Sequence, residues 1–256
     1  MMQKTLNTLI IIFLALPLAA LLYLSAVKFW VYPDLLRAHF SLEFWSGLGG
    51  TYSGLTSSFA LSLLMATSIS LTATGLGFFF SAFLLLVPGR STWLALSFFP
   101  YLIAPVSFGA LLQTYFVRFG LSGSTGGVWI AQLLFVVPYA NILLSTFWNR
   151  HIRQLYQQAI TLGARPLQAL SGIILPLAKP WLGLSLLQCF LISWYEYGIT
   201  RLIGIGKVQT LTVGVMHYLN EANPHVAALA AILLVSPVVL LGAISYIVVG
   251  KLSLQV

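Results

Sequence analysis

The sequence predicts an all-α, polytopic membrane protein. Hydrophobic residues occupy 59% of its 256 positions and charged residues only 6%, whereas soluble domains carry about 25% charged residues. The apolar residues come in runs of roughly 20, the length of a membrane-spanning helix, rather than the alternating segments of about 10 that build a barrel. A helix also satisfies its own backbone polar groups inside lipid.

Hydropathy predicts six spans, which together make one transmembrane domain, residues 1–256. They cover approximately residues 6–27, 55–87, 93–117, 128–148, 177–199 and 226–249. The first run is long enough to span and longer than the apolar part of a signal peptide, so we expect a retained helix. Turn residues separate the spans, as at Val87–Ser91 and in the Gly/Ser-rich loop Gly120–Gly127.

Charge placement predicts the orientation of these spans. With the N- and C-termini in the cytoplasm, seven basic residues and no acid fall on the inner face: Lys4, Arg90, Arg150, Arg153, Arg165, Lys179 and Lys251. Five basic residues and all four acids then fall outside. Because basic residues favour the cytoplasmic side, the net charge of +8 is better explained by orientation than by nucleic acid, and no nucleic-acid partner is expected.

The second span is rich in small polar residues. These are Ser57, Ser58, Ser62, Thr67, Ser68, Ser70, Thr72, Thr74, Gly75 and Gly77. Such residues allow close packing of one helix on another, and a water-lined path is the functional alternative.

A short amphipathic segment separates the fourth and fifth spans. Residues 153–162 can form a helix, Gly163 can end it in the left-handed conformation, and Pro166 suits the first turn of a second helix that runs toward Pro176. Such a corner can act as a stiff lever against another protein, or it can rest on lipid headgroups. The residues alone favour neither.

This segment resembles the EAA motif of ABC-importer permeases: Glu-Ala-Ala, three residues, Gly, nine residues, Ile-x-Leu-Pro. Gln157, Gln158 and Ala159 hold the first three places, Gly163 holds the glycine, and residues 173–176 match the end without a gap. The chain departs from the motif at Gln157 and Gln158. Glutamine keeps the hydrogen-bonding reach of glutamate but loses its charge.

The resemblance implies the type I importer fold, with coupling helices in region 150–176. It implies that an ATPase contacts Gln157, Gln158, Ala159, Leu162, Gly163, Ala164 and Arg165. The implied partners are two ATPase subunits that bind ATP and Mg, a second permease, an extracytoplasmic binding protein, and the lipid of a bacterial inner membrane. The uncharged Gln157 adds the hypothesis that the second permease is non-identical and bears the more typical motif. The sequence has no P-loop pattern of its own, so we expect no enzyme and no bound cofactor.

A second cluster, Trp194, Tyr195, Glu196 and Tyr197, lies at the outer end of the fifth span. A carboxylate at the edge of a span needs hydration or a partner. Arg201 or Lys207 can pair with Glu196, or the cluster can line the translocation path as a gate. The surrounding region, residues 193–231, resembles permeases for ferric iron, thiamine, polyamines and related anions.

The remaining reactive residues predict no metal site. Four histidines, His39, His151, His217 and His225, lack the spacing of metal ligands, and Cys189 stands alone within an apolar run. His217 and His225 can lie near Glu221, where a weak metal contact competes with a solvated loop.

A stand-alone secondary transporter or channel is the alternative function. Such proteins place ionisable groups deep in the membrane, and only Glu196 comes near. A membrane-embedded enzyme needs clustered acids, histidines or a Ser–Lys pair, which the sequence lacks.

Overall fold

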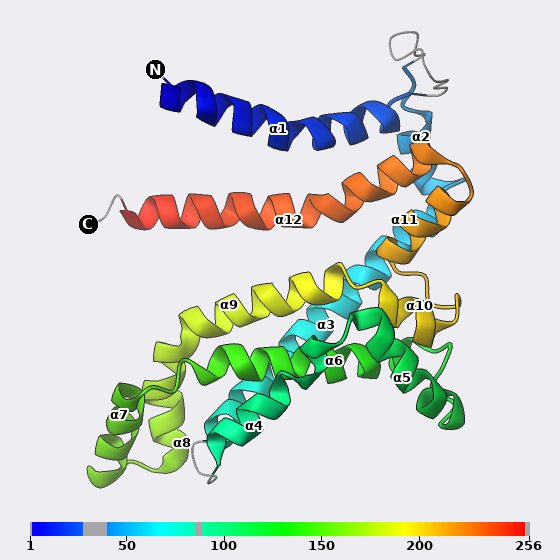
Figure 1. The fold of residues 1–256 in the computed structure, drawn as a ribbon. Coiled ribbons are helices and arrows are strands. Elements are labelled where there is room, and N and C mark those ends of the chain that lie inside the picture. The colour runs from blue at the N-terminus through cyan, green and yellow to red at the C-terminus, as the bar shows by residue number, and fades with distance from the viewer. Residues whose placement is uncertain (1, 28–39, 85–88, 254–256) are drawn as a thin grey trace. The chain divides into compact units, whose positions relative to one another are not determined.

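The computed structural model describes residues 2–27, 40–84 and 89–253, and every named element in these ranges is a helix (Figure 1). The described chain divides into two units, each of which is considered by itself. The first unit comprises residues 1–62 and 209–256, and the second comprises residues 63–208. The all-helical prediction is therefore confirmed for the described residues.

The first unit brings the two ends of the chain together. Its elements are α1 (Met2–Ser25), α2 (Glu43–Ser46), η1 (Gly47–Gly49), the start of α3 (Ser53–Phe83), α11 (Leu211–Asn220) and α12 (Pro224–Ser253). α1 lies beside α12, and the His225 ring fixes their contact, because its Nδ1 lies 2.9 Å from Leu24 O. The same ring stacks on Phe44 with 5.7 Å between ring centres.

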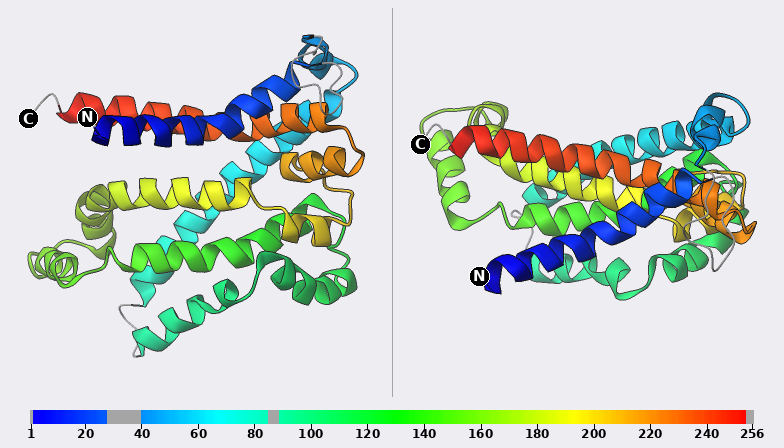
Figure 2. Two further views of the ribbon diagram at one scale, coloured as in Figure 1. Left: turned by 45° about the horizontal axis from the view of Figure 1, so that its top comes forward. Right: turned by 90° about the horizontal axis from the view of Figure 1, so that it is seen from above.

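The second unit holds the rest of α3 and the middle of the chain. Its further elements are α4 (Arg90–Ser97), η2 (Phe99–Leu102), α5 (Pro105–Arg118), α6 (Thr125–Ser145), α7 (Arg150–Thr161), α8 (Pro166–Ala169), η3 (Leu170–Ile174), α9 (Leu175–Trp194) and α10 (Gly198–Gly204). α6 packs against α9. α7 and α8 lie together beyond the ends of these two helices, as Figures 1 and 2 show.

Three helices in the described ranges are long and apolar enough to cross a membrane: Ser53–Phe83, Thr125–Ser145 and Pro166–Trp194. They correspond to the second, fourth and fifth predicted spans. The first and sixth appear as the shorter apolar helices Ala15–Ser25 and Pro224–Leu240, when only described residues are counted. Three of the six predicted spans are therefore supported, and the number six stays a prediction.

The third predicted span, residues 93–117, is not one helix. α4 ends at Ser97, a 3₁₀ turn follows, and α5 starts only at Pro105. Ala104 precedes that proline and is extended, with φ −60° and ψ 143°. Proline disfavours the helical conformation in the residue before it, so Pro105 starts a new helix instead of continuing the old one.

The predicted helix end at Pro176 is also replaced by a continuous run. α8, η3 and α9 follow one another without a break from Pro166 to Trp194. Directly before Pro176, η3 is π-helical, and Leu175 N–H donates to Leu170 O. The wider π turn accommodates a proline whose ring and missing N–H would disrupt a regular α turn.

Small residues on α3 allow close helix packing. A Cβ added at Gly77 would lie 2.5 Å from Ala140 Cβ on α6, so the two helices are in direct backbone contact there. Ser68 Oγ accepts a hydrogen bond from Trp129 Nε1 at 3.0 Å, and Thr74 Oγ1 lies 3.1 Å from Ser185 Oγ on α9. The packing interpretation is confirmed at these positions.

Candidate functional site

The corner between α7 and α8 is built as the sequence predicts. Asn149 caps α7, since its Oδ1 accepts from Ile152 N at 3.0 Å. At the other end Gly163 has φ = +90°. Gly163 N donates to Ile160 O and Ala164 N to Ala159 O, both at 3.0 Å. These two bonds form a Schellman motif, which confirms the left-handed turn at Gly163.

After the turn the chain enters α8 at once. Pro166 occupies the first turn of α8, and Arg165 N donates to Gln168 Oε1 at 3.0 Å. Pro166 lacks an N–H, and the first turn of a helix has no acceptor for one. The chain therefore reverses within four residues, 162–165, between two helices.

An apolar cluster anchors the corner to the rest of the second unit. Its buried members are Phe78, Leu144, Phe147, Trp148, Ile152, Ile174 and Ala178. Ile152 comes from α7 and Ile174 from η3, so both arms of the corner are fixed. Trp148 adds a polar contact, because its Nε1 donates to Ser81 Oγ at 2.9 Å. The cluster therefore connects the corner to α6 through Leu144 and to α9 through Ala178.

The tip of the corner is exposed and carries two leucines on either side of Arg165. Leu162 is 89% exposed and Leu167 is 78% exposed. Gln157 and Gln158 are also exposed, whereas Ala159 is buried against the cluster side of α7. Two protruding leucines beside uncharged polar residues are a surface that another protein can cover, and burying each leucine would contribute about 1.5–3 kcal/mol.

Glu196 lies in a buried polar network at the opposite end of α9. Its Oε1 accepts from Ile199 N at 2.6 Å, and its Oε2 accepts from Thr200 N at 2.9 Å and Thr200 Oγ1 at 2.6 Å. The carboxylate thus satisfies N–H groups at the start of α10, where negative charge is favoured. Glu196 is only 7% exposed in the chain.

Gln132 on α6 extends this network. Its Oε1 accepts from Ser193 Oγ at 2.6 Å, and its Nε2 donates to Thr200 Oγ1 at 2.9 Å. The same Nε2 lies 3.4 Å from Glu196 Oε2. Because Gln132 bonds to Ser193 on α9 and to Thr200 on α10, the network links α6, α9 and α10. Gln132 is an isolated polar residue within an apolar segment, so the sequence gives no sign that it meets Glu196 and Thr200.

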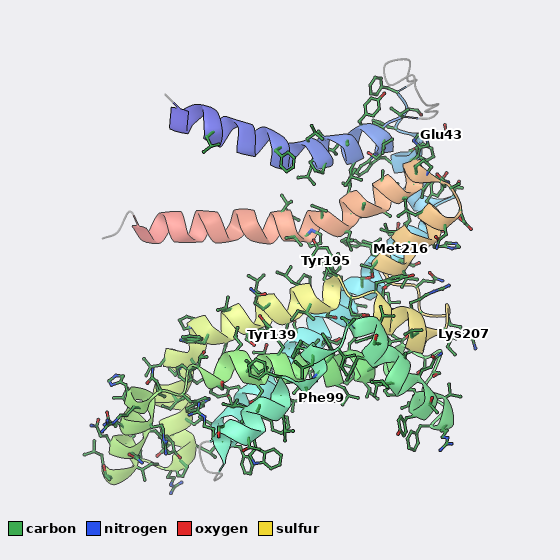
Figure 3. The ribbon with its side chains drawn as sticks, viewed as in Figure 1. Glu43, Phe99, Tyr139, Tyr195, Lys207 and Met216 are labelled. Carbon is green, nitrogen blue, oxygen red and sulfur yellow. The ribbon has the colours of Figure 1, made fainter. Side chains whose placement is uncertain are left out.

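The aromatic neighbours of Glu196 have different surroundings. Trp194 is buried and stacks on Phe190 with 5.6 Å between ring centres. Tyr195 is exposed at the end of α9 (Figure 3), and Tyr197 is half-buried. Two interpretations of the cluster, pairing of Glu196 with Arg201 or Lys207 and a place in the translocation path, stay predictions.

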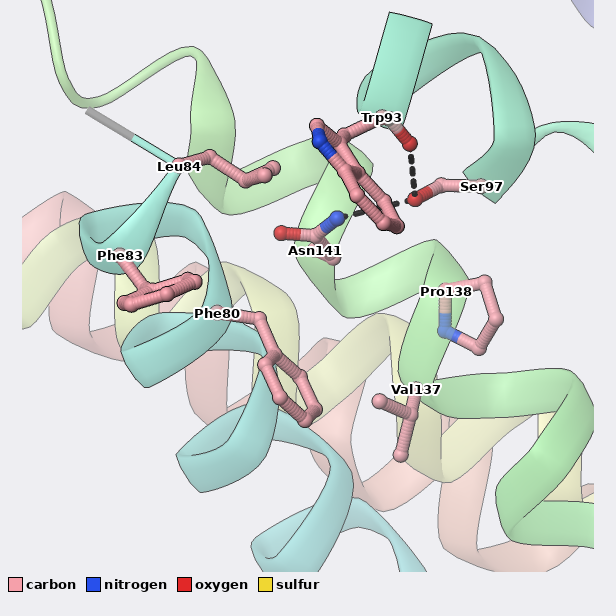
Figure 4. A pocket seen from close by; sticks show the side chains of 8 residues that line it. All are labelled: Phe80, Phe83, Leu84, Trp93, Ser97, Val137, Pro138 and Asn141. Carbon is pink, nitrogen blue, oxygen red and sulfur yellow. Dashed lines mark hydrogen bonds between the residues drawn. The ribbon is translucent and has the colours of Figure 1, made fainter. Parts of the chain in front are cut away.

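A cavity of about 390 Å³ opens between α3, α4 and α6 (Figure 4). Asn141 lies at its polar side, and its Nδ2 donates to Ser97 Oγ at 2.9 Å. Ser97 Oγ donates its hydrogen to Trp93 O, so it must accept from Asn141, which fixes the orientation of the amide. Asn141 Oδ1 is buried and has no hydrogen-bond partner among the described residues.

The histidines and the cysteine form no cluster in the described ranges. His217 Nε2 lies 3.3 Å from Glu221 Oε1, one helical turn away, while His225 contacts Leu24 and Phe44 instead. Cys189 is fully buried beside Ser185. Among the described residues no three His, Cys, Asp or Glu side chains come close enough to hold a metal ion.

Sequence comparison relates the chain to transport proteins. It is 28% identical over 241 residues, 92% of this chain, to the "Putative 2-aminoethylphosphonate transport system permease protein PhnV" of Salmonella typhimurium, covering 89% of that protein. The protein of the same name in Salmonella choleraesuis matches equally. The maltodextrin transport system permease protein MdxG of Bacillus subtilis is 25% identical over 126 residues, 48% of this chain and 45% of that protein.

No protein-family model matches the chain. The proteins that it resembles are permeases of solute transport systems, and this agrees with the apolar helices of the structure. Together they support a multi-pass membrane protein of the transport-permease kind.

Proposed function

We propose that the chain is the permease subunit of an ATP-binding cassette importer. It forms half of a translocation path, and partner ATPase subunits drive it by pushing on the α7–α8 corner. The observation that carries this proposal is the corner itself: a Schellman turn at Gly163, an exposed tip at Leu162 and Leu167, and anchors at Ile152 and Ile174. Its position between two apolar helices, and the spacing of the motif it resembles, support the same function.

The proposed complex needs parts that this chain lacks. Two ATPase subunits supply ATP and Mg, an extracytoplasmic binding protein delivers the solute, and a second permease completes the path. Gln157 carries no charge where the motif has a glutamate, which supports pairing with a non-identical permease that bears the more typical motif. A homodimer of this chain that transports well by itself would contradict the pairing.

The solute is proposed by resemblance. Region 193–231 resembles permeases for ferric iron, thiamine, polyamines and related anions, and the relative that covers most of the chain is named for 2-aminoethylphosphonate. A small charged solute is common to these systems. We therefore expect the binding protein that co-purifies with the complex to hold such a compound, and mass spectrometry of its bound ligand would identify it.

The test of the function is a substitution at Gly163. A Cβ at this position would meet no other atom within 4 Å, so only the left-handed backbone resists a side chain. A β-branched residue adds roughly 1–2 kcal/mol or more to that conformation. We expect Gly163→Val to misplace the corner and abolish co-purification of the ATPase from native membranes, while the chain still inserts.

Gly163→Asn is the matched control, because asparagine tolerates the left-handed region far better than valine. We expect it to retain the ATPase and its hydrolysis. If the valine variant keeps a stoichiometric ATPase, the corner is not the coupling element. If the unmodified chain elutes alone and without hydrolysis, a stand-alone transporter or channel becomes the better hypothesis.

A further inference from the structure

A cationic cavity lies between the start of α4 and α7. It measures about 610 Å³ and is lined by Arg90, Trp148, Asn149, Arg150, Arg153, Gln154 and Gln157. Three guanidinium groups and three side-chain amides surround it, and no lining residue is an acid. All of these groups can donate hydrogen bonds, and three of them are permanently charged.

The positions of these residues follow from the helix period. Residues 150, 153, 154 and 157 recur at intervals of three and four, so they form one stripe along α7. Ile152 and Ala159, on another face of the helix, are buried. Arg90 approaches from α4, and its Nη2 donates to Ser145 O at 2.8 Å, which holds its guanidinium at the end of α6. Arg90 is therefore held in place by α6, while Arg150 and Arg153 are exposed on α7.

The second unit contains no carboxylate that can neutralise this cavity. Among residues 63–208 the sequence has one acid, Glu196. That carboxylate is buried at the start of α10, where Ile199 and Thr200 donate to it. The lining therefore has a net positive charge from Arg90, Arg150 and Arg153, which an external anion would neutralise.

An apolar cavity adjoins the cationic one. It measures about 340 Å³, and Trp148, Arg153 and Gln157 line both. Its other lining residues are Ala82, Phe83, Tyr156, Pro166, Leu167 and Leu170. A ligand that fills both cavities must be anionic at one end and apolar at the other.

We propose that the two cavities together form a binding site for one anionic membrane phospholipid. The phosphodiester accepts hydrogen bonds from Arg90, Arg150 and Arg153, and an acyl chain lies against Phe83, Tyr156 and Leu170. Basic pockets beside membrane-spanning helices recognise anionic headgroups, and α7 lies just beyond the ends of α6 and α9 (Figure 1). An acidic protein surface would satisfy the arginines but would leave the apolar cavity unfilled. Gln157 and Leu167 line these cavities and also belong to the surface that the proposed function assigns to an ATPase, so the lipid and the ATPase would share this surface.

The test uses the purified full-length chain with any subunits that co-purify. Its thermal unfolding midpoint is measured while long-chain phosphatidylglycerol is added, and bound lipids are counted by native mass spectrometry. We expect a saturable rise in the midpoint with one retained lipid. Four compounds serve as controls, and each should give little or no rise in the midpoint. Phosphatidylcholine has acyl chains without a net negative charge. Glycerol 3-phosphate and inorganic phosphate have the charge without a chain, and a six-carbon phosphatidylglycerol has the charge with only short chains.

Arg153→Gln is the informative variant, because Arg153 lines both cavities. We expect it to raise the half-saturating phosphatidylglycerol concentration about tenfold, since it removes a charge-assisted contact to phosphate. Arg153→Lys should restore part of the affinity. Lys179→Gln removes one exposed charge from the nearby end of α9 but lines neither cavity, so its lipid affinity should be unchanged.

Three results would overturn the proposal. A rise with glycerol 3-phosphate or phosphate alone would indicate a site for a free anion. Equal losses in Arg153→Gln and Lys179→Gln would indicate attraction to surface charge in general. A chain that gains no stability from lipid, but gains it from a partner subunit in an Arg153-dependent way, would place an acidic protein surface on the arginines.

Discussion

Two residues, Gly163 and Glu196, have structural roles that the packing of apolar helices does not explain. Gly163 adopts φ = +90° and reverses the chain between α7 and α8. Glu196 gives its carboxylate to the first N–H groups of α10 and to Thr200 Oγ1. The glycine acts through its backbone conformation and needs no neighbour. The glutamate acts through partners on α6 and α10, so its role depends on the tertiary structure.

At Glu196, replacement by glutamine should destabilise the chain. Both carboxylate oxygens accept hydrogen bonds, whereas an amide has one oxygen, and its NH₂ group would face a donor. Leaving a buried donor unsatisfied costs about 1–3 kcal/mol. We expect Glu196→Gln to lower the thermal unfolding midpoint of the purified chain in detergent.

The same variant also tests the proposed path. Thr161→Ser is the control variant, and its midpoint and uptake should match those of the unmodified chain. Thr161 is exposed on α7, and its hydroxyl donates to carbonyls of its own helix, as serine can. If Glu196→Gln slows uptake without any loss of stability, Glu196 contributes to the path directly. An unchanged midpoint with unchanged uptake would contradict both roles.

The helices of the second unit fit together through small residues and through interruptions. Gly77 lets α3 touch α6 at Ala140, and Gly198 lets α10 approach Val106 on α5, where an added Cβ would lie 2.5 Å from its side chain. The interruption between α4 and α5 and the π turn of η3 both occur at prolines. An apolar segment in a membrane forms a helix because the helix satisfies its own backbone hydrogen bonds. The contacts between these helices depend instead on single small residues.

Gly75 and Gly77 provide a matched pair on one helix. A Cβ at Gly77 would lie 2.8 Å from the Ala140 backbone, and a Cβ at Gly75 would meet nothing within 4 Å. We therefore expect Gly77→Ala to destabilise the chain through overpacking by about 1–3 kcal/mol, which would appear as a lower unfolding midpoint. Gly75→Ala should be neutral or stabilising by up to about 1 kcal/mol, because alanine is the better helix former. Equal midpoints would mean that α3 and α6 are not in this contact.

The whole molecule is expected to have a defined orientation in the membrane. Its basic residues predict that the α7–α8 corner faces the cytoplasm and that the loop before α6 faces outward. Thr161 on α7 and Thr125 at the start of α6 are both exposed threonines. They mark the two predicted sides.

Cysteine labelling in intact cells would test this orientation. Cys189 is fully buried, so the unmodified chain should react slowly with a membrane-impermeant maleimide. We expect Thr125→Cys to be labelled from outside and Thr161→Cys to be labelled only after permeabilisation. The reverse pattern would contradict the predicted orientation and would place the corner where a cytoplasmic ATPase cannot reach it.

The sequence alone determined the helical membrane class, the approximate positions of three spans and the turn at Gly163. Hydropathy and backbone preference are properties of neighbouring residues, so they can be predicted without contacts. The tertiary structure decided which distant groups meet. Glu196 meets Gln132 across 64 positions, and Arg90 meets Ser145 across 55. It also brought three arginines, which by sequence indicated only orientation, around one cavity. Such contacts depend on helix packing, which no short segment of the sequence specifies.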